Sequence, residues 1–294
     1  MVEAAGGKSA QLRSWLGGEL FQRVAGPEAV HRHAQISAPG ERWFAEARPI
    51  RRVHGDASMF VGGLRALLLQ SLHPLVMAGV AQHSDYRHDP WGRLQRTSFF
   101  LAVTTFGPVP EAERAIARVR SVHRLIRGTT ADGHAYAADD PHLLGWVHLA
   151  EVDSFLAAYQ RYGIGAQLDQ TERDDYIADT SVVAAKLGVI DPPGNEVEMR
   201  DQLASFRPEL AGSAAAREAA RFLLLPRPLP LAARLPYSAL AAAAVGLLPV
   251  WARWPLRLPY LPASEATVGR LAGRGVVAGI SWALTPGSSN SSID

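Results

Sequence analysis

Three histidines each lie on the apolar side of a different predicted helix: His73, His123 and His148. His123, for example, shares a helical face with Ile116 and Val119. Burying an imidazole without a hydrogen-bond partner costs roughly 1–3 kcal/mol, so each ring needs a group to bind. A neutral imidazole is also a common ligand of transition metals. The pattern therefore indicates either a metal centre or core histidines whose nitrogens bond to neighbouring groups.

A second group of residues lies near the start of the predicted helix 90–106. Four residues share one side of this helix: Arg93, Arg96, Thr97 and Phe100. Guanidinium groups beside an apolar pocket suit the binding of carboxylates, such as the propionates of a haem. The alternative is a cluster at the helix start that neutralises Asp85 or Asp89. The residues alone leave both interpretations open.

The types of residue present narrow the choice of metal. The chain has no cysteine, which excludes disulfides, thiolate zinc sites and cysteine-ligated clusters, and it has no HExxH motif. Histidines with a carboxylate could bind non-haem iron. Glu151 and Asp153 follow His148 closely, although Asp153 falls on another face of the helix. A b-type haem fits better, because apolar helices would bury the macrocycle and one imidazole would bind its iron.

Composition sets the wider limits. The chain has 294 residues, 48% of them hydrophobic, and a formal net charge of +2. This is enough for a large core, and the lack of a basic block argues against nucleic acid as a partner. The first residues do not resemble a secretory signal, so we expect a cytoplasmic protein. The most apolar stretch, Tyr237 to Trp254, is interrupted by Pro249 and Arg253, which favours a buried helix or a peripheral membrane contact over a span.

The elements that position these residues are predicted to be helices almost everywhere, with no convincing strand alternation. Asp89-Pro90 and Asp140-Pro141 are typical helix starts, with an N-cap followed by proline at the first helical position. The helices are expected near residues 9–24, 56–83, 90–106, 110–127, 141–162, 170–187, 195–206, 213–224, 237–248 and 264–284.

The fold class that follows is all-α, a single large helical domain. We divide it into an N-terminal helical extension, a helical core that holds the cofactor, C-terminal helices packed on that core, and a disordered tail. These parts are expected at residues 1–55, 56–225, 226–286 and 287–294, respectively. The proline-rich stretch from Leu225 to Tyr237 is interpreted as a crossing between helical segments.

Three stretches together resemble the MpaB/latex-clearing-protein oxygenase family: "HPLVMAGVAQHS…DPWGRLQRT", "VRSVHRLIRG" and "DPHLLGWVHLAEVDSF". The resemblance extends from about Gly62 to Gly163. It implies an all-α, globin-like core that holds one haem b. It also implies that His123 binds the haem iron, and that Arg93 and Thr97 lie near the haem.

The sequence departs from this family at Arg96, where latex clearing protein has a lysine that can cap the distal face of the iron. A guanidinium stays protonated and offers no lone pair, so Arg96 is a poor iron ligand. We expect it to donate a hydrogen bond to dioxygen, a propionate or the substrate instead. His73 and His83 are candidates for the distal pocket, and His148 and Phe100 for contacts with the cofactor. The other histidines are predicted to face solvent: His31, His33, His54, His88, His134 and His142.

The function that the resemblance implies is a haem-dependent oxygenase. Its partners would be dioxygen and a small apolar substrate, for which an isoprenoid or another alkene is the family precedent. Two alternatives stay open at this stage. One is a non-catalytic carrier of haem or of a hydrophobic ligand, or a gas sensor. The other is a helical structural protein whose histidines are ordinary core residues.

Overall fold

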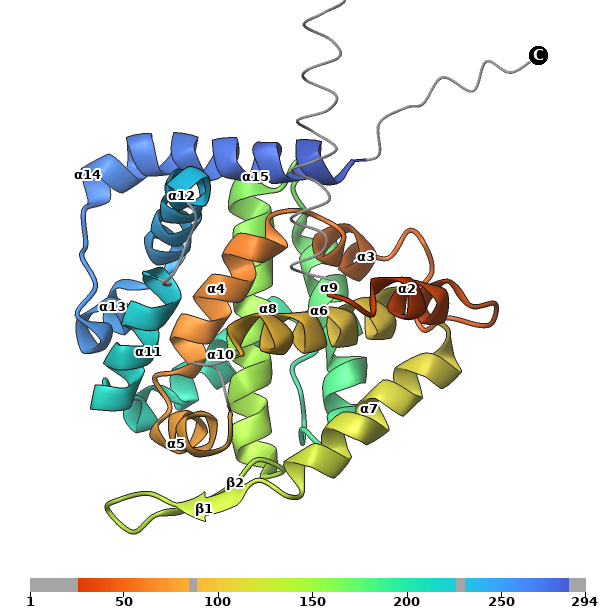
Figure 1. The fold of residues 1–294 in the computed structure, drawn as a ribbon, viewed down its shortest axis with the longest axis horizontal. Coiled ribbons are helices and arrows are strands. Elements are labelled where there is room, and N and C mark those ends of the chain that lie inside the picture. Colours follow the sequence, from red (N-terminus) through yellow and green to blue (C-terminus); the bar gives the residue numbers. More distant parts are fainter. Residues whose placement is uncertain (1–25, 85–88, 226–230, 286–294) are drawn as a thin grey trace, which may run out of the picture.

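The computed structural model describes residues 26–84, 89–225 and 231–285, and nearly all of the regular secondary structure in them is helical (Figure 1). The predicted all-α class is confirmed. The predicted helix 9–24 and the tail 287–294 lie outside the described residues. The helices between residues 26 and 187 of the described part are α2 Ala29–Ser37, α3 Pro49–His54, α4 Met59–Gln70, α5 Pro74–His83, α6 Pro90–Phe106, α7 Val109–His123, α8 Pro141–Tyr162 and α9 Gln170–Leu187. The later helices are α10 Glu196–Ser205, the 3₁₀-helix η1 Arg207–Glu209, α11 Ala214–Leu224, α12 Leu231–Leu247, α13 Val250–Leu256, α14 Pro262–Ser264, the π-helix η2 Glu265–Gly269 and α15 Arg270–Leu284.

Helix α8 is the central element of the fold and runs through the middle of the molecule in Figure 1. Buried residues follow it on all sides, and Trp146 is completely buried. Helix α4 packs closely against it, because Gly62 has no side chain at the crossing. A Cβ at this position would lie 2.8 Å from the Phe155 ring and 3.1 Å from the Ser154 carbonyl oxygen. This close approach fixes α4, and with it the turn that carries His73.

The helix starts that the sequence predicts are confirmed by their caps. The Asp89 carboxylate accepts a hydrogen bond from the Gly92 amide at 2.8 Å, and Asp140 accepts one from the His142 amide at 2.8 Å. Each bond satisfies an amide that the first turn of a helix leaves free. The predicted helices 90–106, 141–162 and 170–187 have the same bounds as α6, α8 and α9.

The predicted single helix 56–83 is wrong, because two helices, α4 and α5, occupy this range and meet at 105°. Pro74 lacks an amide proton and disfavours helical backbone at the preceding residue. His73 accordingly takes an extended conformation and becomes the N-cap residue of α5. The bend moves the His73 ring out of a helical face and to the corner between two helices.

The described residues also include two short strands that the sequence pattern did not indicate. Helix α7 ends at His123, and a short antiparallel hairpin follows, formed by β1 Arg127–Thr129 and β2 Ala135–Ala137. Gly133, with φ of +90°, makes the reversal of the chain easy in the loop. The hairpin keeps the segment after His123 beside the start of α8.

The C-terminal helices lie over one end of this arrangement. Helix α12 packs on α4, and α15 packs on α12 and crosses the end of α8 (Figure 1). Helix α12 begins at Leu231, before the predicted start at 237, and contains Pro236. In the described part of the chain, no single helix has the length and apolarity of a membrane span. Two pairs of consecutive helices reach that length and apolarity only when the two helices of a pair are taken together, and each pair is sharply bent. These pairs are α4 with α5, and Ala233–Leu247 with α13.

Candidate functional site

His123 is the last residue of α7 and its side chain is half-buried. Its ring forms no hydrogen bond with another described residue. Burial lowers the pKa of the imidazole, and the negative charge of Asp139 opposes this only in part. At neutral pH the ring is therefore uncharged, with a nitrogen lone pair available to a ligand.

The residues predicted on α6 lie on the helix that packs against α7. The Arg93 guanidinium donates to the Ser84 hydroxyl at 2.6 Å, and Phe100 is half-buried. Thr97 is exposed, and so is Arg96, which pairs with Asp89 at 3.3 Å. The interpretation of Arg96 as a partner of Asp89 is thus supported, while the side chain keeps most of its surface open to solvent.

The other two predicted contacts of the cofactor differ in burial. His83 is exposed, with the edge of its ring toward Tyr136 at 6.1 Å between centroids. His148 is buried in α8, and its Nε2 has no hydrogen-bond partner among the described residues. Burial lowers the pKa of His148 to about 4, so this ring is neutral. Its burial in the core was predicted correctly, whereas the missing partner is a feature that only the structure shows.

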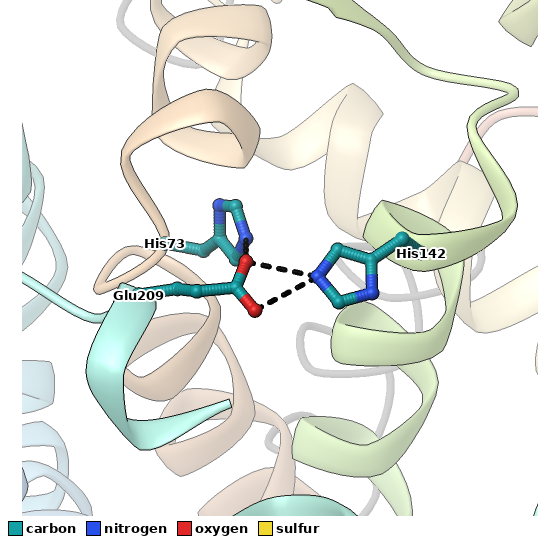
Figure 2. A group of neighbouring side chains, drawn as sticks. All are labelled: His73, His142 and Glu209. Carbon is teal, nitrogen blue, oxygen red and sulfur yellow. Dashed lines mark hydrogen bonds and ion pairs between the residues drawn. The ribbon is translucent and has the colours of Figure 1, made fainter. Parts of the chain in front are cut away.

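Three segments that are distant in the sequence meet at a group that we call the His73 cluster: His73, His142 and Glu209 (Figure 2). Both imidazole rings point toward the Glu209 carboxylate. Nε2 of His73 lies 3.3 Å from Oε2, and Nε2 of His142 lies 2.8 Å from Oε2 and 3.0 Å from Oε1. The described contacts therefore join His73 to Glu209 and His142, and not to Arg96 or Thr97.

The protonation states in the His73 cluster follow from burial and charge. Burial lowers the pKa of His73, against the opposing hydrogen bond and charge of Glu209. Burial also disfavours the charged form of Glu209, but the hydrogen bonds and charges of His142 and His73 outweigh it and lower its pKa. The cluster at neutral pH thus has a neutral His73 beside an ionised carboxylate.

Two members of this cluster were missed by sequence reasoning. His142 was expected to face solvent, and its side chain is indeed 54% exposed, but it also bonds to Glu209. Glu209 lies in the short helix η1 and was not predicted as a site residue. These residues are separated by 67 positions, and His73 and Glu209 by 136. No short motif or helical period could have brought them together.

The prediction that His54 faces solvent is wrong. Its Nδ1 lies 2.8 Å from the Thr105 hydroxyl, and its Nε2 lies 3.4 Å from the Tyr176 hydroxyl. The Phe155 ring contacts it edge-on. This burial lowers the pKa of His54 to about 3. His54 closes α3 at a point where α3 is packed between α6, α8 and α9, so its place at a helix end did not imply exposure.

Comparison with known protein families gives a match that covers residues 51–279. The family is described as ER-bound oxygenase mpaB/B'/rubber oxygenase, catalytic domain. The chain belongs to this family. It therefore has an oxygenase catalytic domain, for which dioxygen and a substrate are the reactants. Comparison with the curated proteins and with the solved structures gave no match.

The matched region of the mpaB/rubber-oxygenase family contains every candidate residue described above. It also extends well beyond Gly62 to Gly163, the part that carries the sequence resemblance, and includes helices α9 to α13 and most of α15. The C-terminal helices are thus part of the family's catalytic domain.

Proposed function

We propose that this member of the mpaB/rubber-oxygenase family is a haem b-dependent oxygenase and that His123 is the ligand of the haem iron. The observation that carries this proposal is the His123 imidazole, which is half-buried, neutral and without a hydrogen bond to another described residue. A neutral imidazole keeps one nitrogen lone pair that can bind a metal ion. In the proposed complex the haem iron would bind at Nε2.

The surroundings of His123 fit a flat apolar group with acidic edges. Val122 and Leu125 expose 49% and 82% of their surface next to it, and Leu94 on α6 is also exposed. A macrocycle would cover such apolar groups, and the exposed Arg124 offers a cation for a propionate. We assign Arg93 and Phe100, on the neighbouring helix, to further contacts with the cofactor. The globin-like arrangement of the core stays a prediction.

When bound, a haem in an oxygenase supplies the binding and activation of dioxygen. The contribution of this chain would be to orient the reactants. Arg96 and Thr97 present hydrogen-bond donors on α6, and we assign them to dioxygen or to a polar atom of the substrate. Arg96 remains protonated throughout, so it acts as a fixed positive charge and not as a ligand or a base.

We do not assign His73 to the distal pocket, because its Nε2 faces Glu209. His148 is a better candidate for a contact with the cofactor, since its Nε2 is buried without a partner among the described residues. The substrate that we propose is apolar, with an isoprenoid or another alkene as the first class to test. The basis for this choice of substrate is the family resemblance.

The test is to express the full chain with a haem precursor and to record its absorption spectrum, its iron content and its oxygen uptake with an alkene such as squalene. We expect a Soret band, about one iron per chain, and oxygen uptake that requires the alkene. The His123→Ala variant should lose the band, whereas His134→Ala, which removes an exposed histidine, should keep it.

The other outcomes separate the alternatives. A Soret band without oxygen uptake for any alkene would favour a haem carrier or sensor. A chain that takes up no haem when haem is supplied would contradict the proposal. Retention of full haem by His123→Ala would contradict the assignment of the ligand.

A further inference from the structure

The His73 cluster has the composition of a metal site, and it contains none of the residues assigned to haem. Two imidazoles and one carboxylate form a ligand set that suits divalent transition ions, such as Zn²⁺, better than Mg²⁺ or Ca²⁺. One ligand atom from each of His73, His142 and Glu209 can be chosen so that all three lie within 4.8 Å of one another. Each residue comes from a different segment: the turn before α5, the first turn of α8, and η1.

The distances are close to those that one small ion imposes, and one of them already fits. With bonds of roughly 2.0–2.1 Å, a tetrahedral zinc ion holds its ligand atoms about 3.3–3.4 Å apart. Nε2 of His73 already lies 3.3 Å from the Glu209 carboxylate. The 2.8 Å between Nε2 of His142 and the same oxygen would have to lengthen by a few tenths of an ångström. Side-chain rotation of the exposed His142 suffices for such a change.

The backbone holds the three residues in place without the ion. The Ala211 amide donates to the Leu72 carbonyl oxygen at 2.8 Å, which ties the segment after η1 to the turn that carries His73. His142 stacks on the Phe206 ring at 4.5 Å, directly before η1. The ligands are thus positioned before any ion binds, and this lowers the entropic cost of binding.

The burial of the cluster is graded from one side to the other. The His73 side chain is 2% exposed, whereas those of Glu209 and His142 are 41% and 54% exposed. An ion therefore has access from solvent on one side, where water could complete its coordination. On the buried side, Nδ1 of His73 has no partner among the described residues, so the ring proton can reside there without breaking a hydrogen bond.

We propose that His73, His142 and Glu209 bind one divalent transition ion of the Zn²⁺ type, in addition to the haem. The ion would cross-link the α4–α5 corner, the start of α8 and η1. The proposal stands independently of the proposed function, because it uses none of the residues assigned to the haem.

The test is a calorimetric titration of the untagged, full-length protein with Zn²⁺, after dialysis against a chelator. We expect one site and a rise in the melting temperature on addition of Zn²⁺, with no response to Mg²⁺. His142→Ala and Glu209→Gln replace accessible side chains, so both should fold, and each should weaken Zn²⁺ binding at least about tenfold.

The matched control is His134→Ala. His134 also lies beside a carboxylate, with Nδ1 3.1 Å from Asp132 Oδ2, but this exposed pair has no second imidazole. The control should bind Zn²⁺ like the wild type. Equal affinity in all variants, or no binding by the wild type up to about 1 mM Zn²⁺, would overturn the proposal and leave the cluster as a hydrogen-bonded group only. Neither result depends on the Soret band, so failure here is distinguishable from failure of the haem assignment.

Discussion

Two imidazole centres of this oxygenase domain differ in what the protein itself provides. In the His73 cluster, both rings bond to Glu209, and hydrogen bonds and stacking hold the surrounding backbone. At the end of α7, His123 is half-buried, without a hydrogen bond to another described residue, and has exposed apolar neighbours. In the first centre the folded chain itself supplies a hydrogen-bond partner for Nε2 of each ring. At His123 the described residues supply none, and we propose that the haem iron does.

This difference suggests different consequences of mutation. Residues with hydrogen bonds and packing contacts inside the folded chain contribute to its stability, and their removal leaves cavities or unpaired polar groups. A residue whose main partner would be a cofactor contributes little to the stability of the apoprotein. The two centres can therefore be separated by measuring stability and cofactor binding on the same variants.

The largest expected effect on stability is that of His73→Ala. The change leaves a cavity beside Trp146 and Phe206 and removes a partner of Glu209, so we expect a loss of about 2–4 kcal/mol in the free energy of unfolding. His123→Ala should cost less than about 1 kcal/mol in the absence of haem. Urea denaturation of both apoproteins measures the difference. Equal losses in the free energy of unfolding would show that His123 contributes as much to the stability of the apoprotein as His73 does.

A second expected effect is a loss of stability in mild acid. The pKa values of His54 and His148 fall from 6.5 to about 3 and about 4 on folding. Below pH 6.5 the unfolded chain therefore binds protons that the folded chain does not, and stability decreases as the pH falls toward 4. Glu151, whose pKa burial raises to about 7, acts in the opposite direction between pH 7 and 4.5.

The contribution of His54 can be isolated with His54→Asn, which keeps a polar group near the Thr105 hydroxyl and cannot titrate. Between pH 6.5 and 5 this variant should lose less stability than the wild type, by about 1–2 kcal/mol. Chemical denaturation across this pH range is the measurement, with the exposed His134→Asn as control. An unchanged pH dependence in His54→Asn would show that the burial of this ring does not govern it.

A smaller effect is expected for His142→Ala in metal-free protein. Its side chain is more than half exposed and its hydrogen bond with Glu209 is open to solvent, so the variant should lose less than about 1 kcal/mol. The contrast with His73→Ala shows which side of the His73 cluster supports the fold. Urea denaturation measures this. If the free energy of unfolding fell as much as in His73→Ala, the stacking of His142 on Phe206 would contribute more stability than its exposure indicates.

The smallest effect on stability is expected for Arg96→Ala, because the guanidinium is exposed and its one ion pair within residues 26–84, 89–225 and 231–285 is with Asp89 at 3.3 Å. This variant should unfold like the wild type and keep its haem, but its rate of oxygen uptake should change. Stopped-flow absorption measurements of oxygen reactivity, together with the spectrum at rest, would check this. Unchanged oxygen kinetics would remove Arg96 from the proposed site.

Local chemistry explains why parts of the fold could be predicted. Asp89 and Asp140 cap their helices through amides only two or three residues away, and the prolines that follow them fix the first turn. The start of α6 and that of α8 were predicted correctly for this reason. The break at His73 was missed because the apolar pattern continues across Pro74, and the strands of the hairpin are only three residues long.

The site was predictable to the extent that it is local. His123 is a candidate from its helical face and its motif, and its assignment as a ligand stays a prediction. Its lack of a hydrogen bond to another described residue is a property of the folded chain. His142 and Glu209 could not be found, because their partners lie 67 and 136 positions away. His54 was predicted to face solvent, and this is wrong because α3 packs between three other helices. The sequence of α3 alone does not indicate this packing.

The most direct test of the account is to replace the His123 ring with one that is not part of the chain. A His123→Gly variant should lose the Soret band of the wild type and regain it when free imidazole is added, since the small molecule can occupy the space of the deleted ring. The His142→Gly variant should keep the band without imidazole. A His123→Gly protein that binds haem with the spectrum of the wild type, and that does not respond to imidazole, would contradict the assignment of His123 as the iron ligand.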